Sequence, residues 1–389
     1  MHVIVTDCHY RTTPALIREL AAAGHTVTAV CEASHTPVGL RCRQAKHARL
    51  LPAGLSEIDY REALLDLCHS LGRPVLLPVG ARTVDILARF AAHFRPAAHF
   101  LAPAPEALDR ANDKAAVARE ATRLGIPVPA AFAPEGDEPL EHFARRLSYP
   151  VVLKYRCGEK LGLPAERRYT IARYATEFSR RYRTMEDVQA PVLVQEYIRG
   201  RGLGVSVLMD AQGRPAFVFC HERLREYPVS GGPSTACRSA WFPALAERAV
   251  ALLRALHFSG FAMVEFKGTP ENARLLEINP RLWGSFPLAC LCGAAPGRRY
   301  VDAACGVTPD PPGCTYQTGF QMQYFFSDAA AAFGYLRRGR LDQTAAFVVD
   351  CLSPRTKGGV FSASDWPGSL AYVHSLLRRS RNRPPGGGE

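Results

Sequence analysis

The chain has 389 residues, of which 47% are hydrophobic and 22% charged, and its formal net charge is +12. These values are typical of a globular protein with two or three domains, and they exclude an intrinsically disordered chain. The sequence has no apolar run long enough to span a membrane, and its start, MHVIVTDCHY, does not resemble a signal peptide. We therefore expect a cytoplasmic protein with no membrane partner.

The positive charge comes from 42 arginines, against only six lysines. The arginines are spread along the chain and form no long basic run interleaved with aromatic residues, so nucleic acid is disfavoured as a partner. Phosphates and carboxylates of small molecules are anions that such a composition can also bind. The twelve cysteines show no metal-ligand spacing, and we expect reduced thiols.

Residues 1–105 alternate between short apolar runs and amphipathic runs. The predicted strands are His2–Thr6, Val27–Val30 and Val75–Pro78, and the predicted helices are Pro14–Ala23, Tyr60–Leu71 and Thr83–His93. This alternation predicts an α/β domain with a doubly wound parallel sheet. The loops Asp7–Arg11 and Gly80–Thr83 follow strands at the edge where such sheets bind ligands, although no GxGxxG motif supports a dinucleotide site.

Pro103 and Pro105 mark a domain boundary, and we predict a second, α+β domain over residues 106–310. Its predicted subdomains are about 106–190 and 191–310. Its predicted helices are Pro105–Leu124, Tyr174–Met185 and Ala244–Leu256, and its first predicted strands are Tyr149–Tyr155, Val192–Ile198, Gly204–Met209 and Ala216–Arg223. These strands follow one another rather than alternating with helices. Residues 311–389 read as a C-terminal extension without identifiable chemistry, and from about Arg378 their composition predicts a disordered tail.

The most informative segment is a predicted hairpin of strands Phe261–Lys267 and Ala273–Ile278. In simple register it sets Glu265 opposite Glu277, where the two negative charges repel unless a cation lies between them. Asn279 follows on the same face as Glu277 and supplies a third oxygen. Such hard oxygen ligands predict a Mg²⁺–nucleotide site, and the alternative is an ordinary surface hairpin with scattered acids.

Two lysines stand out because lysine is rare in this chain. Lys114 lies in Asn112–Lys114, inside the first predicted helix of the second domain, and Lys154 ends the apolar strand 149–155. A compact ammonium group suits a phosphate oxygen, although either lysine can also be a solvated surface residue.

The loop His221–Thr235, with sequence HERLREYPVSGGPST, has the composition of an anion-binding segment. Arg223 and Arg225 are expected on one strand face, and Ser230–Thr235 can form a turn rich in backbone N–H groups. These features suit a γ-phosphate or a substrate carboxylate. The alternative to an anion-binding segment is an exposed strand followed by a Gly-Gly-Pro turn.

Taken in order, these motifs resemble those of ATP-grasp enzymes of the carboxylate–amine ligase type, similar to carbamoyl phosphate synthetase and biotin carboxylase. The resemblance covers about Pro105–Gly306, and residues 1–105 resemble the domain that precedes it in such enzymes. It implies that ATP binds between the two α+β subdomains together with Mg²⁺, for which Mn²⁺ can substitute. Lys114 and Lys154 would hold the α- and β-phosphates, with Lys154 also near the adenine.

The resemblance implies a role for the remaining candidates as well. They comprise a lid loop at 156–166 with Gly158 and Gly162, the adenine-binding segment Gln195, Glu196 and Ile198, the metal ligands Glu265, Glu277 and Asn279, and the catalytic arginines Arg223, Arg225 and Arg281. Gly202 stands where these enzymes often have an acid that binds the ribose.

The implied reaction joins a small-molecule carboxylate to an amine through an acyl phosphate, with release of ADP and phosphate. Amino acids are candidate substrates, the product is an amide or peptide-like bond, and such ligases are often homodimers. A small-molecule kinase on the same scaffold and a nucleotide-binding protein without turnover are the two alternatives.

Overall fold

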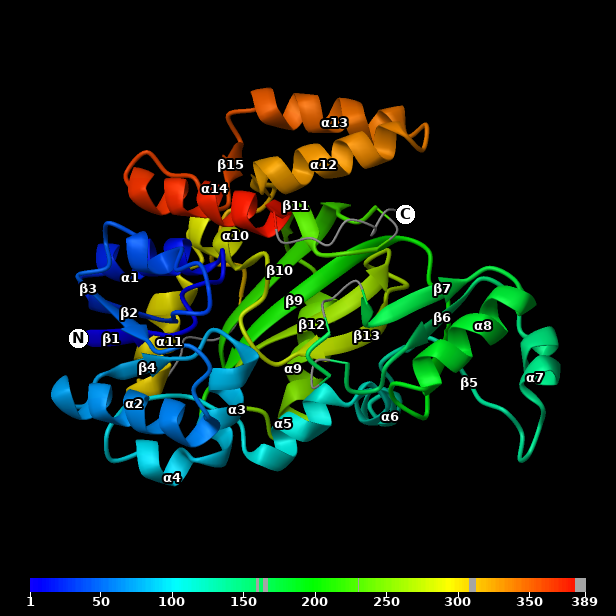
Figure 1. The fold of residues 1–389 in the computed structure, drawn as a ribbon, viewed down its shortest axis with the longest axis horizontal. Helices are drawn as coiled ribbons and strands as arrows, with labels where there is room; N and C mark the ends of the chain where they lie inside the picture. Colours follow the sequence, from blue (N-terminus) through cyan, green and yellow to red (C-terminus); the bar gives the residue numbers. More distant parts are fainter. Residues whose placement is uncertain (159–160, 164–166, 230, 308–312, 382–389) are drawn as a thin grey trace.

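The computed structural model describes residues 1–158, 161–163, 167–229, 231–307 and 313–381. Three sheets form the described molecule, with the N-terminal sheet at one end, a long central sheet, and a small sheet at the other end (Figure 1). The mixture of a parallel α/β sheet with antiparallel α+β sheets confirms the predicted fold class.

The N-terminal sheet is parallel throughout, with strand order β3-β2-β1-β4. Its elements are β1 (His2–Val5), α1 (Thr13–Ala22), β2 (Thr26–Glu32), a short 3₁₀ helix (Gly39–Arg41), β3 (His47–Leu51), α2 (Glu57–Ser70), β4 (Val75–Leu77), α3 (Ala81–Arg89) and α4 (Ala91–Phe94). Val3 and Val5 face one core while Ile4 faces the other, so both faces of the sheet are covered. The sequence did not predict β3, because four of its five residues are exposed and it lacks an apolar run.

The central sheet has seven strands in the order β13-β12-β9-β10-β11-β14-β15. The strands are β9 (Arg201–Met209), β10 (Pro215–Glu226), β11 (Ser234–Ala240), β12 (Gly260–Gly268), β13 (Arg274–Asn279), β14 (Gln321–Gln323) and β15 (Thr356–Gly358). Neighbours are antiparallel except β14 and β15. Val205 and Val207 face a core that includes α9 (Pro243–Ala255). Leu208 faces the opposite core, shared with the N-terminal sheet, α10 (Phe286–Leu291) and α11 (Pro296–Ala304).

The prediction of a single helix over residues 105–124 is wrong, because this segment forms two helices. Helix α5 (Pro105–Asn112) ends before Asp113, whose backbone is extended, and α6 (Lys114–Arg123) begins after it. The Asp113 carboxylate accepts hydrogen bonds from the N–H groups of Ala115 and Ala116, which makes it the N-cap of α6. Lys114 is therefore the first residue of a helix rather than an interior one.

The small sheet is antiparallel, with strand order β5-β8-β6-β7. It contains β5 (Ala131–Phe132), β6 (Val151–Lys154), β7 (Tyr169–Ala172) and β8 (Leu193–Glu196), and its helices are α7 (Leu140–Arg146) and α8 (Ala175–Glu186). Val151 and Leu153 pack in one core with residues of both helices. Lys154 and Gln195 therefore lie on the opposite face, because side chains alternate along a strand.

The C-terminal residues are part of the central sheet rather than a simple appendage. β14 and β15 extend its edge beyond β11, and α12 (Phe325–Leu336), α13 (Leu341–Leu352) and α14 (Trp366–Arg381) follow or flank these strands. Helices α12 and α13 lie side by side at the top of Figure 1. The predicted disordered tail began at Arg378, but α14 continues to Arg381, and residues 382–389 lie outside the described part.

Candidate functional site

The hairpin β12–β13 sets Glu265 directly opposite Glu277, as the sequence predicted. The side chains are 13% and 28% exposed, so both carboxylates are largely removed from water. Glu265 Oε2 lies 2.6 Å from a guanidinium nitrogen of Arg223, and Glu277 Oε2 lies 3.2 Å from Lys114 Nζ. Asn279 stands beside them, with its amide nitrogen 3.5 Å from Glu277 Oε1.

Lys114 and Lys154 approach these carboxylates from two different elements. Lys114 begins α6, and the backbone N–H of Lys114 donates to the carbonyl oxygen of Arg156 at 3.2 Å. The Arg156 guanidinium in turn binds the Asp113 carboxylate through two hydrogen bonds of 2.7 and 2.6 Å. The start of α6 is thereby fixed to the first residues after β6, the strand that ends in Lys154.

Burial and charge act differently on the two opposed carboxylates. Burial raises the pKa of Glu265, and Arg223 opposes that shift. Burial acts on Glu277 in the same direction, but Lys114 and Lys154 outweigh it and lower the pKa of Glu277 to about 2. Burial also lowers the pKa of Lys154. Two largely buried acids among three cationic side chains form a site that suits a divalent cation and phosphate oxygens together.

Arg223 and Arg225 are not equivalent positions of one regular strand. The register of β10 against β11 shifts between them, and their guanidinium groups bind different partners. Arg225 is buried and binds Asp328 at 2.7 Å and Asp350 at 2.6 Å. Because both partners come from the C-terminal helices, the sequence offered no signal for this cluster. With its charge already paired, Arg225 is not positioned to bind a substrate anion.

The segment after β8 contains the predicted adenine-binding residues. Gln195 is buried, and its Oε1 has no hydrogen-bond partner among the described residues. The Glu196 carboxylate accepts from the Ala130 N–H at 3.2 Å, and the Glu196 N–H donates to the Ala130 carbonyl at 2.9 Å. Ile198 is half-buried just beyond the strand. A buried carbonyl oxygen without a donor is a position where a ligand N–H can bind.

Tyr169 on β7 is a site residue that the sequence did not indicate. It pairs with Lys154 across β6 and β7, and its ring lies among the charges of Glu265, Glu226 and Arg223. Its hydroxyl lies so close to Gly231 that a Cβ there would be 1.7 Å from it. Gly231 also has φ +131°, which favours glycine. The small sheet and the loop after β10 therefore meet above the carboxylates.

Part of the predicted lid loop lies outside the described residues, namely 159–160 and 164–166. The prediction for Ser230 in the anion-binding turn also falls on a residue outside the described part. Of the two lid glycines, Gly162 has φ +65°, and a Cβ on Gly158 would lie 3.3 Å from the Arg168 side chain.

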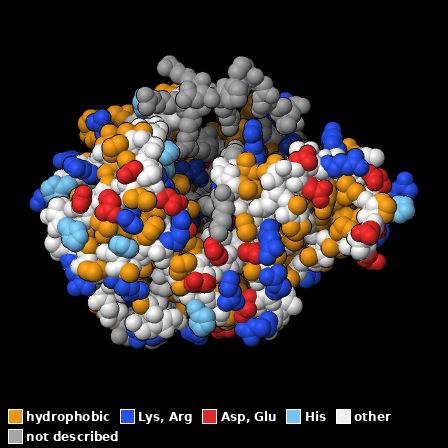
Figure 2. Space-filling view, turned by 60° about the horizontal axis from the view of Figure 1, so that its bottom comes forward, with side chains coloured by type: hydrophobic (Ala, Val, Ile, Leu, Met, Phe, Trp, Pro, Cys, Tyr) orange, Lys and Arg blue, Asp and Glu red, His pale blue; other side chains and the backbone are white. Residues whose placement is uncertain are grey.

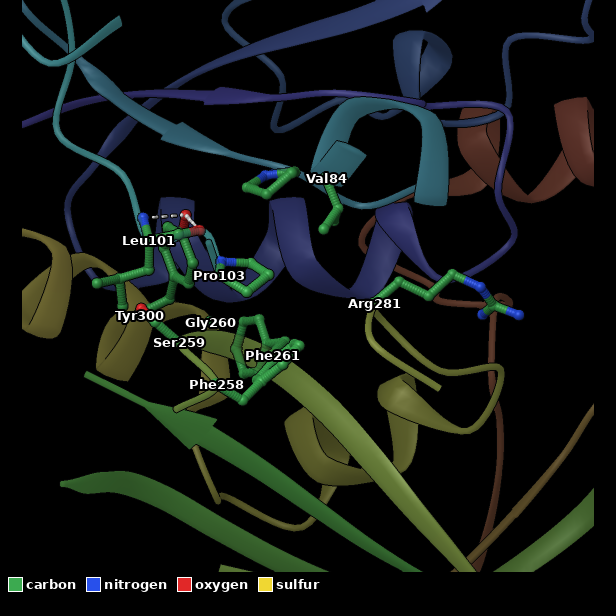
Figure 3. A pocket seen from close by; sticks show the side chains of 10 residues that line it. Val84, Leu101, Pro103, Phe258, Ser259, Gly260, Phe261, Arg281 and Tyr300 are labelled. Carbon is green, nitrogen blue, oxygen red and sulfur yellow. Dashed lines mark hydrogen bonds between the residues drawn. The ribbon is translucent and has the colours of Figure 1, made fainter. Parts of the chain in front are cut away.

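Arg281 lies in the loop after β13, where it donates to the Leu282 carbonyl oxygen at 2.9 Å. A cavity of about 10 Å³ adjoins this loop between the N-terminal sheet and the strand end at Gly260. Figure 3 shows the Arg281 guanidinium extending away from the other side chains around this cavity. Such a volume holds about one water molecule, so the cavity is not a substrate site.

The loop after β1 reaches the central sheet. The Arg11 guanidinium lies 3.5 Å above the Tyr324 ring and donates to the Ser234 carbonyl oxygen at 3.3 Å. Asp7, in the same loop, accepts from the Gly80 N–H at 2.9 Å. The loop after β1 therefore contacts both the central sheet and the loop after β4.

Two other kinds of site lack support among the described residues. In the described part of the chain, no three His, Cys, Asp or Glu side chains gather as a metal-binding cluster. No described helix combines the length and apolar character needed to cross a bilayer. Figure 2 shows lysine and arginine side chains scattered among acidic ones, without a continuous basic band on the face in view.

Sequence comparisons match this region of the chain. Residues 189–325 match the family described as "ATP-grasp in the biosynthetic pathway with Ter operon". Pyruvate carboxylase of Bacillus subtilis is 28% identical over 196 residues, which cover 47% of this chain and 17% of that protein. The large chain of carbamoyl phosphate synthase from Pyrococcus furiosus is 26% identical, with 47% and 18% covered. The chain thus spans less than a fifth of these curated relatives.

Solved structures resemble a larger part of the chain. The biotin carboxylase domain of 2-oxoglutarate carboxylase from Hydrogenobacter thermophilus, a dimer in complex with MgADP, ADP and bicarbonate, has a TM-score of 0.62 at 18% identity. It covers 82% of this chain and 73% of that one. Biotin carboxylase from Campylobacter jejuni, in a β-γ-ATP complex, has a TM-score of 0.64 at 16% identity, with 82% and 74% covered. Residues 189–325 therefore match an ATP-grasp family model, and the solved structures show that most of the chain shares the biotin carboxylase fold.

Proposed function

We propose that this protein is an ATP-dependent carboxylate–amine ligase that forms an amide or peptide-like bond. The observation that carries the proposal is the pair of opposed carboxylates, Glu265 and Glu277, surrounded by Lys114, Lys154 and Arg223. The likeness to ATP-grasp carboxylases and to a carbamoyl phosphate synthase supports an enzyme of the C–N ligase type.

In this proposal MgATP binds between the small sheet and the central sheet. Glu265, Glu277 and Asn279 would hold Mg²⁺, or Mn²⁺ in its place, and the metal would neutralise charge on the phosphates. Lys114 and Lys154 would bind the α- and β-phosphates as compact point charges. The lowered pKa values of Lys154 and Glu277 are consistent with a crowded ionic site that gains from a further anion and cation.

The adenine would lie at the end of β8. The buried Oε1 of Gln195 lacks a donor among the described residues, and the exocyclic amino group of adenine supplies one. Glu196 and Ile198 follow on the same segment and would contact the edge of the base. This arrangement leaves the lid glycines, Gly158 and Gly162, near the phosphate end.

The reaction first makes the carboxylate a good electrophile. A carboxylate oxygen of the substrate attacks the γ-phosphorus, ADP leaves, and an acyl phosphate forms. The amine then attacks the acyl carbon, the C–O bond to phosphate breaks, and phosphate and a proton are released. Arg223 and Arg281 would stabilise the charge on the transferred phosphoryl group. Arg225 is left out because Asp328 and Asp350 already pair with its guanidinium.

Two contacts between segments next to the proposed site support the idea that these segments exclude water from it. The Arg156–Asp113 pair joins the start of the lid loop to α6, and Tyr169 contacts the loop at Gly231. Water would otherwise hydrolyse an acyl phosphate, so a covered site favours attack by the amine.

The proposed partners are a small-molecule carboxylate and a small-molecule amine, with amino acids as candidates. We also propose a cytoplasmic homodimer without a membrane or nucleic-acid partner. The structural neighbour described as a dimer supports the proposed assembly.

Trapping with hydroxylamine tests the proposed chemistry. The protein is incubated with ATP, Mg²⁺, hydroxylamine and a panel of carboxylic acids, and products are identified by mass spectrometry. We expect an ATP-dependent hydroxamate whose mass names the acid. A new phosphate ester without a hydroxamate would instead assign a small-molecule kinase, and binding of ATP without any product from a broad panel would favour a silent nucleotide-binding protein.

A further inference from the structure

The C-terminal helices expose an unusual amount of apolar surface. Of the twenty large apolar side chains that are exposed among the described residues, twelve lie between Phe325 and Leu377. None of the described side chains of α13 is fully buried, although seven of its twelve residues are aliphatic or aromatic. Soluble monomers rarely expose contiguous apolar surface of this kind, so a partner is expected to cover it.

The exposed side chains of α13 form one stripe along the helix. Leu341, Val348, Val349 and Leu352 are 65%, 52%, 64% and 81% exposed, and the exposed Ala345 fills the gap in the stripe. Their spacing of four, three, one and three residues keeps all five within about 100° of the helix circumference. The opposite side of α13 carries Phe347 toward Phe325 and Asp350 toward Arg225.

The hairpin that carries this stripe is firmly attached to the central sheet. Asp328 of α12 and Asp350 of α13 both bind the buried Arg225 of β10, and Asp328 also accepts from the Thr235 hydroxyl at 2.7 Å. Helix α12 adds its own exposed apolar side chains, Phe333 at 62% and Leu336 at 45%. The stripe is therefore a fixed surface feature of the folded chain.

Three observations favour a second copy of this chain as the occupant. The residues after α14, NRPPGGGE, contain no large aliphatic or aromatic side chain that could cover the stripe. The polar positions of α13 are Asp342, Gln343, Thr344 and Asp350, without the lysines or arginines that helices on anionic lipid carry. Finally, four of the five stripe residues are symmetric about its midpoint, so an antiparallel copy sets Leu341 against Leu352 and Ala345 against Val348, while Val349 meets Thr344.

We propose that two copies of this chain associate through the α12–α13 hairpin, with α13 packed antiparallel to α13 of the partner subunit. This inference rests on the homodimer of the proposed function and locates its interface, but it does not depend on the reaction. Pairing of antiparallel helices also opposes their dipoles favourably. Phe333 and Leu336 of α12 add exposed apolar surface to the same hairpin, and a standard interface buries about 800 Å² per partner.

Light scattering coupled to size exclusion tests the proposal on the full chain. One chain has a mass of 42.6 kDa. The wild-type protein is expected at twice this mass, and V348E at the mass of one chain. The matched control is I58E, which places the same charge on an equally apolar residue of α2 that is 59% exposed. I58E should remain a dimer, and circular dichroism should report folded protein for both variants.

A charge pair tests the antiparallel arrangement itself. A345K should also be monomeric, whereas the double variant A345K/V348E should regain the dimer, because antiparallel helices bring opposite charges together. A parallel pair would set like charges against each other. Failure of the double variant to dimerise overturns the arrangement.

Two further outcomes overturn the interface. The first is a wild-type protein that stays monomeric as its concentration is raised. If that monomer sediments with vesicles of anionic phospholipid, the stripe is a lipid contact. A dimeric V348E would equally assign the interface elsewhere. Binding of a fluorescent ATP analogue should be unchanged in V348E, so failure of the interface is distinguishable from failure of the nucleotide site.

Discussion

Glu265 and Glu277 face each other across β12 and β13, yet each carboxylate contacts a different cationic side chain. Arg223 approaches Glu265 from β10, and Lys114 approaches Glu277 from the start of α6. The register of one hairpin thus brings together charges that lie up to 163 residues apart in the sequence. Because the carboxylates would otherwise repel, the pair is maintained by the cationic residues around it and by the metal that we propose.

Glu277→Gln is expected to lower ATP-dependent hydroxamate formation by roughly 100-fold or more, because it removes a proposed metal ligand and the partner of Lys114. The fold should persist, since the substitution is isosteric. The measurement is product formation together with a thermal melt. Glu271→Gln, in the exposed turn of the same hairpin, is the matched control and should retain activity. Substantial activity in Glu277→Gln would remove the metal assignment.

Arg225→Met is expected to destabilise the protein by about 3–5 kcal/mol, because it leaves the buried carboxylate of Asp328 without its partner. Chemical unfolding measures the change. Arg340→Met is the control, because the Arg340–Asp342 pair is more than half exposed and such pairs contribute only about 0–1 kcal/mol. Equal stability losses in the two variants would show that the buried cluster is not specially important.

His221 is expected to make the protein less stable in acid. The side chain is buried between β9 and the Ser285 hydroxyl, and burial lowers the pKa of His221 to about 3. The unfolded chain has an ordinary histidine pKa of about 6.5, so it gains a proton that the folded chain does not. The contribution of His221 to stability is therefore fully present above about pH 6.5. It is lost as the pH falls toward 3, by about 2 kcal/mol at pH 5.

Unfolding measured between pH 7 and pH 5 tests this expectation. His221→Gln should reduce the dependence of stability on pH, whatever its effect at pH 7. His93→Gln alters an exposed histidine and should leave the dependence unchanged. A wild-type pH slope that survives in His221→Gln would contradict the assignment.

Gly231→Ala is expected to disturb the contact between the small sheet and the loop after β10. A Cβ at this position would lie 1.7 Å from the Tyr169 hydroxyl, and the backbone has φ +131°. We expect a loss of ATP-dependent turnover of roughly tenfold, and Gly231→Ala combined with Tyr169→Phe should recover part of it because the hydroxyl is removed. Gly136→Ala, at another positive-φ glycine with open space around it, controls for backbone strain alone. No recovery in the double variant would mean that the contact does not act through the hydroxyl.

The sequence by itself determined the elements whose signal is local. Apolar runs and their alternation with helices predicted the parallel N-terminal sheet, and the spacing of Glu265, Glu277 and Asn279 around a turn predicted the opposed carboxylates that the register confirms. The scarcity of lysine marked Lys114 and Lys154, which the fold brings to Glu277. Each of these predictions depends on periodicity or composition within a short segment.

The tertiary structure alone decided which charges are already paired. Arg225 pairs with Asp328 and Asp350, whereas Arg223 pairs with the carboxylate of Glu265, so only Arg223 lies at the proposed site. Tyr169 lies at the site because folding brings its hydroxyl next to Gly231, a residue 62 positions away in the sequence. A residue's charge is visible in the sequence, but its availability depends on partners that folding brings from distant segments, and no local pattern records them.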